Sequence, residues 1–286
     1  MSVFDCDHSD FDYLFLLRIK MGYSIGTILE HRQCNPTQLL NMNKLSKSSL
    51  VLILLVAYWA DADAQKKTIL VDVGHGQIFY SDPAEGKSND LVNTERLKYM
   101  TGELSKNAEA SNAKIAYQKS AITQDALAKA DILFIHVPSV KYTTEEVTAI
   151  QQFVGKGGSL CIVSEVDYWA TLDKVNVNDI LKPFGITFKG DHPDGNAVGG
   201  YSASTDVTQK YKIPYHGARL VEGGTPFAYS DKSKENPFGV YKEVKGGGKI
   251  VAMGEGMVSL YMTSWQGVDD YQCAGFMGEV FAWLLK

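Results

Sequence analysis

A histidine between two glycines follows the first strongly apolar run of the chain. The run covers residues 68–73, and Gly74-His75-Gly76 comes directly after it. A short apolar run that ends in glycine is typical of a buried strand opening into a loop. In an open α/β sheet, ligands bind at the carboxyl ends of the strands, so His75 is expected where a ligand would bind.

Polar side chains follow the other expected strands in the same way. Histidine and carboxylate groups at one crevice could transfer protons or hold a ligand. No His-x-His or His-x₃-His pair exists in the chain, so we predict no metal site and no cofactor. The catalytic candidates are His75, His136 and Glu165. The ligand-binding candidates are His75, Gln77, Ser139, Glu165, Trp169, Glu255 and Trp265.

Aromatic residues in polar loops form a second constellation. Trp169 follows the expected strand 159–163, and Trp265 follows the expected strand 249–253. An exposed aromatic ring can stack on the C–H face of a sugar, while neighbouring polar groups bond to its hydroxyls. The pattern therefore favours a carbohydrate or another small molecule as the ligand. Core packing of most of these rings is the alternative interpretation.

The elements that must position these residues read as an α/β fold. Four short apolar runs alternate with helical patterns, as in a parallel sheet covered on both faces. We predict a doubly wound, mostly parallel sheet, a flavodoxin-like three-layer sandwich, with an irregular β-hairpin elaboration in the second half. The expected strands are 68–73, 114–117, 131–136, 159–163, 212–215, 218–221, 227–229 and 249–253, and the expected helices are 94–107, 123–129, 143–154 and 275–285.

Two local signals refine this prediction. Thr143 and Glu146 are spaced as in a capping box, in which each side chain bonds to the other's backbone N–H at a helix start. Cys161 lies in the middle of an apolar strand, far in sequence from Cys273 and without metal spacing. We therefore expect two buried thiols rather than a disulfide or a catalytic cysteine.

We do not expect the first 64 residues to belong to the folded domain. Residues 42–64 combine a basic start, an apolar stretch and an Ala-x-Ala site, as in a secretory signal peptide, and the stretch is too short to span a membrane. We interpret residues 1–41 as an upstream mis-start without a stable fold and residues 65–286 as a single domain. The expected location is periplasmic or secreted, with no membrane span in the mature chain. The net charge of −5 gives no reason to expect nucleic acid as a partner.

The order of elements resembles a known superfamily. The segment from Asp131 through His136-Val-Pro138 and Thr143-Thr-Glu-Glu146 to Gly157-Gly158, and the later segment from Asp206 to Gly254, resemble class I glutamine-amidotransferase-like proteins. The nearest branches are the ThuA-like proteins, domains related to gliding-motility accessory proteins, and the domain of the intraflagellar-transport proteins. The resemblance implies one amidotransferase-like α/β domain over about residues 68–285.

One departure limits what the resemblance implies. Active members carry a Gly-x-Cys-x-Gly elbow after the strand that corresponds to residues 159–163, but here Ser164-Glu165-Val166-Asp167 follows. We therefore predict a secreted, non-catalytic module that binds a small molecule or carbohydrate, with envelope proteins as further partners. The alternative is a hydrolase acting on a glycan or its ester, with Glu165 or Asp167 as base and His75 or His136 as acid. A third interpretation is a pure interaction domain, which buried and mutually satisfied candidate side chains would favour.

Overall fold

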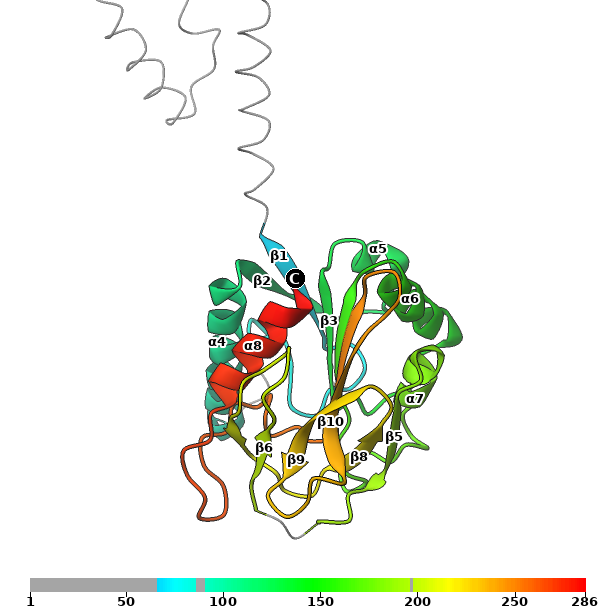
Figure 1. Ribbon diagram of the computed structural model, residues 1–286. Coiled ribbons are helices and arrows are strands. Elements are labelled where there is room, and N and C mark those ends of the chain that lie inside the picture. The colour runs from blue at the N-terminus through cyan, green and yellow to red at the C-terminus, as the bar shows by residue number, and fades with distance from the viewer. Residues whose placement is uncertain (1–65, 86–90, 196–197) are drawn as a thin grey trace, which may run out of the picture. The chain divides into compact units, whose positions relative to one another are not determined.

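The computed structural model describes residues 66–85, 91–195 and 198–286, which belong to one compact unit, Lys66–Lys286. The segments interpreted as a mis-start (1–41) and a signal peptide (42–64) lie outside the described residues. The unit is an α/β fold built on a nine-stranded sheet (Figure 1). No helix within the described ranges has the length and apolar character needed to cross a membrane.

One half of the sheet is parallel. Its central strands β3 and β4 are apolar and buried along their whole length, since both of their faces are covered. Neighbouring strands pair in the order β2-β1-β3-β4-β11. The bounds are β2 (Ala113–Gln118), β1 (Lys67–Asp72), β3 (Ile132–His136), β4 (Ser159–Val163) and β11 (Lys249–Met253).

The other half continues the same sheet with antiparallel strands. From β11 the order runs β10-β9-β6-β7, and each neighbouring pair is antiparallel. A separate two-stranded sheet pairs β5 with β8. The bounds are β10 (Pro237–Glu243), β9 (Thr225–Ser230), β6 (Gly200–Ser202), β7 (Lys212–Ile213), β5 (Thr187–Asp191) and β8 (Arg219–Glu222).

Helices cover both faces of the parallel half. Figure 1 shows α4 and α8 on one side and α5, α6 and α7 on the other. Each side encloses its own apolar core: Leu104 and Phe276 belong to the first, Ile150 and Ile180 to the second. The bounds are α4 (Leu91–Ala110), α5 (Gln124–Leu127), α6 (Thr144–Gly155), α7 (Val177–Leu181), the 3₁₀ helix η3 (Lys182–Phe184) and α8 (Cys273–Leu284).

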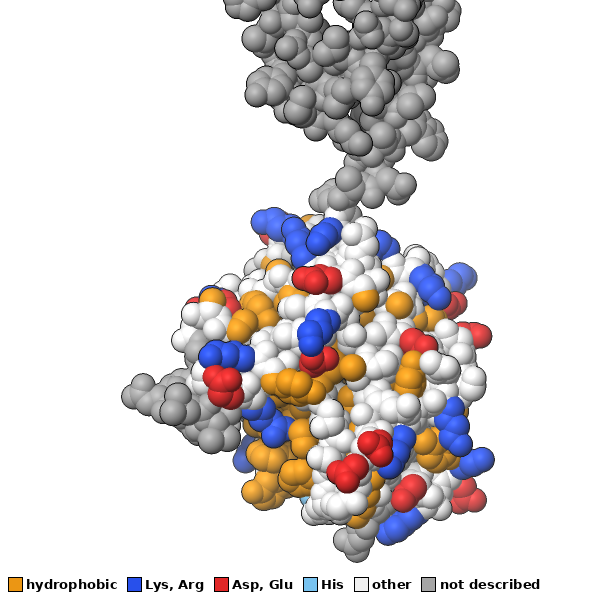
Figure 2. Space-filling view, turned by 90° about the vertical axis from the view of Figure 1, so that its left-hand side faces the viewer, with side chains coloured by type: hydrophobic (Ala, Val, Ile, Leu, Met, Phe, Trp, Pro, Cys, Tyr) orange, Lys and Arg blue, Asp and Glu red, His pale blue; other side chains and the backbone are white. Residues whose placement is uncertain are grey.

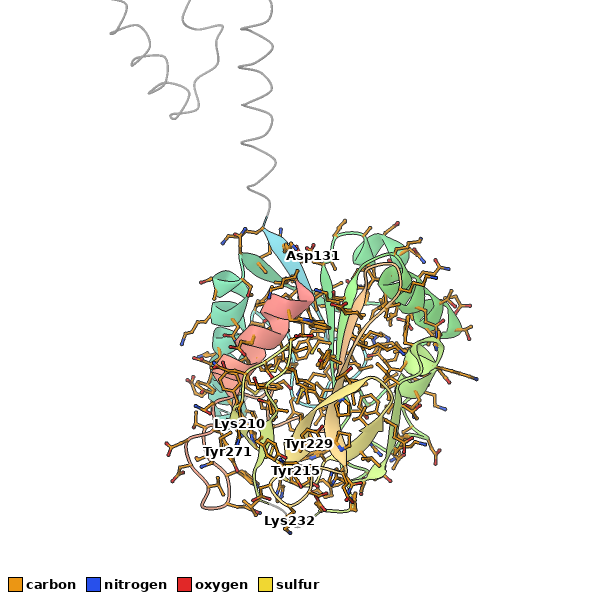
Figure 3. The ribbon with its side chains drawn as sticks, viewed as in Figure 1. Asp131, Lys210, Tyr215, Tyr229, Lys232 and Tyr271 are labelled. Carbon is orange, nitrogen blue, oxygen red and sulfur yellow. The ribbon has the colours of Figure 1, made fainter. Side chains whose placement is uncertain are left out.

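The amino ends of the parallel strands all lie at the same end of the unit. Asp131, just before β3, lies at the upper end in Figure 3, whereas Tyr215, Tyr229 and Tyr271 lie at the lower end. The Asp131 carboxylate accepts a hydrogen bond from the Thr68 N–H at 2.7 Å, which joins the amino ends of β1 and β3. The carboxyl ends, with the loops that follow them, therefore lie toward the lower end.

Several predictions from the sequence are confirmed. Strands β4 and β11 have the predicted bounds, and α6 begins with the predicted capping box, in which the Glu146 N–H donates to Thr143 Oγ1 at 3.2 Å and the Thr143 N–H to Glu146 Oε2 at 2.9 Å. Cys161 and Cys273 are both buried free thiols. The prediction for the second half is met in part: antiparallel strands follow there, but four of them extend the large sheet, which is therefore mixed.

Strand β10 was missed because Gly239 and Pro237 interrupt its apolar pattern. The register with β9 shifts on both sides of Gly239, as at a β-bulge. An added Cβ at Gly239 would lie 2.7 Å from the Ala228 Cβ and 3.1 Å from the Phe227 ring. Close packing of β9 against β10 therefore requires glycine, although glycine weakens the sequence signal for a strand.

This packing predicts the effect of a substitution. Gly239→Val is expected to lower the free energy of unfolding by about 1–3 kcal/mol, because the added methyl groups overpack the contact with Ala228. Urea unfolding followed by tryptophan fluorescence measures the change. Gly190→Val in β5 is the matched control, since an added Cβ there meets no atom within 4 Å. Equal losses of stability in the two variants would contradict this account.

Candidate functional site

The carboxyl ends of four adjacent strands bring the predicted polar residues together. Strands β1, β3, β4 and β11 lie side by side, and His136, Val163 and Met253 are aligned in the register at their ends. His75 follows β1, Glu165 follows β4 and Glu255 follows β11. All of these side chains are buried, including that of His136.

His75 is held between two carboxylates. Its Nδ1 lies 3.0 Å from both carboxylate oxygens of Asp72, and its Nε2 lies 3.0 Å from Glu146 Oε1. The ring stacks on Tyr142, with centroids 4.0 Å apart. Because each ring nitrogen faces a carboxylate, both act as donors only when the imidazole is protonated. The three side chains form a buried ion chain, Asp72–His75–Glu146.

The electrostatics agree with a protonated ring. Burial by itself lowers the pKa of His75, but the hydrogen bond and negative charge of Asp72, together with the charge of Glu146, outweigh it and raise the pKa above 6.5. The pKa of Glu146 is lowered: burial raises it, but hydrogen bonds from the Thr143 and Ile122 N–H groups and the charge of His75 prevail.

Asp72 is the centre of this cluster. Its carboxylate also accepts hydrogen bonds from the Gly74 N–H at 3.0 Å, Gln77 Nε2 at 3.0 Å and the Tyr142 hydroxyl at 2.6 Å. Gln77 Oε1 in turn accepts from the His136 N–H at 3.2 Å, which joins the loop after β1 to β3. Asp72 and Tyr142 were not among the candidates. The carboxylate three residues before His75, in an otherwise apolar strand, could have identified Asp72, but no sequence signal singled out Tyr142.

Ser139 fastens the neighbouring loop. Its hydroxyl donates to the Gly76 carbonyl at 2.7 Å, and its N–H donates to the His75 carbonyl at 3.0 Å. Gly76 has φ +62°, and an added Cβ would lie 2.4 Å from Ser139 Oγ. Glycine is therefore required here, and Ser139 lies against the backbone of the loop after β1.

Glu165 and Glu255 form a second buried cluster. Glu165 accepts from the Gly256 N–H at 2.6 Å, and Glu255 accepts from the His216 N–H at 2.7 Å and the Met257 N–H at 2.9 Å. Burial raises the pKa of Glu165 well above its usual value, and the charge of Glu255 adds to this; burial also raises the pKa of Glu255 to about 7. The pair therefore retains a proton at neutral pH.

His136 joins this second cluster. Its Nε2 lies 3.3 Å from the Gly256 carbonyl, and its ring packs edge-on against Tyr80 at 4.9 Å between centroids. No group of three or more His, Cys, Asp and Glu side chains among the described residues could hold a metal ion.

Arg219 is a buried cation that was not among the candidate residues. Its side chain is fully buried in β8, where Nη2 bonds to Asp167 and to the Ala170 carbonyl at 2.7 Å, and Nη1 lies 4.0 Å from Asp191. Asp167 was a base in the hydrolase hypothesis. An arginine inside the apolar run 218–221 was the available signal, because a buried guanidinium needs acidic partners.

The two candidate tryptophans differ in exposure. Trp169 is 43 % exposed, next to Tyr168 at 83 %, and its ring meets Phe79 at 4.9 Å between centroids. Trp265 is half-buried and packs edge-on against His216 at 5.3 Å. Of the two tryptophans, Trp169 is therefore the more exposed. Two hollows in the described part, of about 490 and 390 Å³, lie at the amino ends of the strands and beside β2, away from both tryptophans.

The chain is similar to known proteins over parts of its length. The family model of the IFT52 GIFT domain matches residues 85–194, fewer than half of the chain. The solved structure "mmIFT52 N-terminal domain" shares 19 % identity and a TM-score of 0.56, covering 76 % of this chain and 97 % of that one. This likeness shows a shared fold. No curated protein sequence matches the chain.

Other solved structures are less similar. A cytoplasmic protein from Salmonella typhimurium LT2 has 14 % identity and a TM-score of 0.48, covering 77 % of this chain and all of that one. A "thua-like protein" from Bacteroides uniformis has 11 % identity and a TM-score of 0.41, covering 78 % and 92 %. Of the branches that the sequence resembles, the family model and the structure of shared fold match that of the intraflagellar-transport proteins.

These findings correct the functional prediction. The prediction of a secreted or periplasmic module that binds a small molecule or carbohydrate, with envelope proteins as partners, was wrong, and so was the alternative of a glycan hydrolase. The matching family model and the structure of the same fold both belong to IFT52, an intraflagellar transport protein. The carbohydrate hypothesis relied on stacking rings, but Trp265 packs against His216. The candidate residues themselves remain predictions. His75, Gln77, His136, Glu165 and Glu255 lie in the two buried clusters, whereas Ser139, Trp169 and Trp265 lie outside them.

The His75 ion chain predicts a pH-dependent stability. A histidine pKa that is higher in the folded state adds stability that is fully present below about pH 6.5 and is lost as the pH rises through the folded pKa. His75→Gln is therefore expected to cost about 3 kcal/mol at pH 6, by leaving buried carboxylates without their cation, and less at pH 9. Urea unfolding across this range measures the difference. His216→Gln, at an exposed histidine, is the control, and a pH-independent cost for His75→Gln would contradict the assignment.

The Glu165–Glu255 pair predicts a second pH effect. The folded protein binds more protons than the unfolded chain between about pH 4.5 and 7, so this pair lowers stability as the pH rises across that window. Glu255→Gln should flatten the dependence of unfolding free energy on pH between 5 and 7. Glu235→Gln, at an exposed glutamate, should leave it unchanged. The same slope in the wild type and Glu255→Gln would rule out a raised Glu255 pKa.

Proposed function

We propose that the described domain is a non-catalytic protein-binding module of a multiprotein assembly, as the intraflagellar transport protein IFT52 is part of one. The observation that carries the proposal is the match of residues 85–194 to the IFT52 GIFT domain. The fold shared with the "mmIFT52 N-terminal domain" supports it over a longer stretch.

The carboxyl-edge chemistry supports the same proposal. A general acid or base must meet its substrate, within hydrogen-bond reach or through one water. Here both ring nitrogens of His75 face carboxylates inside the fold, and Glu165 and Glu255 accept backbone N–H groups. These polar groups bond to one another and to the backbone of the loops. Their role in the proposal is to fix the loops at the carboxyl ends of the strands.

Three exposed apolar side chains and one half-buried side chain, Phe79, lie in the loops that these buried clusters fasten. We name Phe79, Val140, Tyr168 and Trp169 the carboxyl-edge patch. Val140 is 51 % exposed, and Trp169 meets both Phe79 and Tyr168 at 4.9 Å between ring centroids. The patch comes from the loops after β1, β3 and β4, which the buried clusters fasten. Exposed aromatic side chains on a rigid base are favoured at protein interfaces.

The parallel half fits a finer fold proposal. Its strand order, β2-β1-β3-β4-β11, follows the order of flavodoxin-like doubly wound sheets, in which the strand succession reverses next to β1. We propose a flavodoxin-like core whose sheet is extended by antiparallel strands. In that arrangement the carboxyl-edge patch lies at the switch point, between the loops after β1 and β3.

The proposal predicts which variants lose a protein partner. The double variant Tyr168→Ser, Trp169→Ser should weaken binding of the partner more than about tenfold, because buried aromatic anchors carry much of the affinity of an interface. The tagged wild-type chain is cross-linked in its native cells, the co-purified protein is identified and produced, and the affinity of the purified pair is measured by calorimetry.

The control variant also removes an exposed aromatic ring, but one that lies outside the carboxyl-edge patch. Tyr99, on α4, is 47 % exposed, so Tyr99→Ala removes a comparable ring from another surface and should bind normally. A chain that stays monomeric and binds no protein in stoichiometric amount would overturn the proposed function. Equal weakening by Tyr99→Ala would move the interface away from the carboxyl edge.

A further inference from the structure

A hollow runs between helix α4 and the outermost strand of the large sheet. It measures about 390 Å³, within the roughly 300–1,000 Å³ of typical binding clefts. Small side chains line it on the α4 side, namely Thr101, Gly102, Ser105 and Ala108. On the other side lie Ile115 and Tyr117 of β2. We name it the α4–β2 groove.

The strand along this groove has an unpaired edge. β2 is the terminal strand of the sheet, and no strand in the described part pairs with its outer side. The Lys67 and Val73 N–H groups donate to the carbonyls of Asn112 and Gln118, so even-numbered residues of β2 face β1. Because the backbone alternates along a strand, the N–H and C=O groups of Ala113, Ile115 and Tyr117 point outward along the groove.

Gly102 keeps the groove open. It lies in the interior of the 20-residue helix α4, where glycine costs roughly 0.5–1 kcal/mol relative to alanine. An added Cβ at Gly102 would meet no atom within 4 Å, so close packing in the described fold does not require glycine there. The open space faces the outward backbone of β2.

The charges beside the groove are mostly positive. Lys66, Lys98 and Lys114 line it against Glu109 alone. Lys98 is paired with Glu95, but neither Lys66 nor Lys114 has an ion-pair partner in the described part of the chain. Figure 2, which views the α4 side, shows several Lys and Arg side chains at its upper end, with Asp and Glu among them, and hydrophobic side chains gathered lower. The groove therefore favours an acidic occupant.

We propose that the α4–β2 groove binds an extended acidic segment of a partner protein, which adds to the sheet as a strand beside β2. The segment pairs with the outward N–H and C=O groups of Ala113, Ile115 and Tyr117. On one face its small apolar side chains enter the groove at Gly102. On the other its acidic side chains lie across from Lys114, where cross-strand neighbours interact.

The test uses a short fluorescent peptide of alternating valine and glutamate, with the full-length chain and fluorescence anisotropy. Saturable binding is expected for the wild type. Gly102→Leu fills the groove without breaking the helix and should weaken binding more than about tenfold, since a filled cleft excludes the ligand. Gly155→Leu is the matched control, because an added Cβ at this other helical glycine also meets open space, and it should bind as the wild type does.

Charge reversal separates strand addition from general attraction. Lys114→Glu should weaken the valine–glutamate peptide by roughly threefold to tenfold and should strengthen a valine–lysine peptide by a similar factor. The proposal is overturned if the valine–glutamate peptide does not bind, if both peptides bind the wild type equally, or if Gly102→Leu binds as Gly155→Leu does. The groove is separate from the carboxyl-edge patch, so either can fail without the other.

Discussion

The arrangement of the carboxyl edge depends on the buried ion chain Asp72–His75–Glu146. Asp72 ends β1, His75 lies in the loop after it, and Glu146 lies in the first turn of α6. One protonated imidazole therefore joins the end of β1 and the loop after it to a helix whose Glu146 lies 71 residues further along the sequence. Two carboxylates on opposite sides of one buried ring would repel each other without the cation between them.

The exposed surface depends on what lies beneath it. Gln77 connects Asp72 to the backbone of β3, and Ser139 fastens the loop after β3 to the loop after β1. Glu165 does the same between the loops after β4 and β11, through the Gly256 N–H. The aromatic side chains above these bonds stand on loops with little freedom to move, which lowers the entropy lost when a partner binds. The buried polar residues resemble a reactive site, but in the proposed function they hold the loops of a docking surface in place.

The sequence predicted most of the parallel half, and the reason is local. Continuous apolar runs such as residues 159–163 and 249–253 are strands buried on both faces, and the Thr143–Glu146 box marks a helix start within its own turn. Strand β10 could not be recognised, because Gly239 is explained only by its neighbour Ala228 on another strand. The position of the site could be predicted, because His75, Glu165 and Glu255 follow the strand ends. Its role could not, because the pairing of His75 with Glu146 and of Arg219 with Asp167 depends on tertiary contacts.

The protonation state of His75 tests the central claim most directly, because that claim makes the polar edge a structural support. Nitrogen-15 NMR of the imidazole reports both ring nitrogens in the full-length chain. The buried ion chain predicts a His75 pKa raised above 6.5, with two N–H protons on the ring that are protected from exchange below that pKa. A neutral ring at pH 7 that titrates at or below 6.5 and exchanges freely with water would contradict it, and would return His75 to the residues open to a ligand.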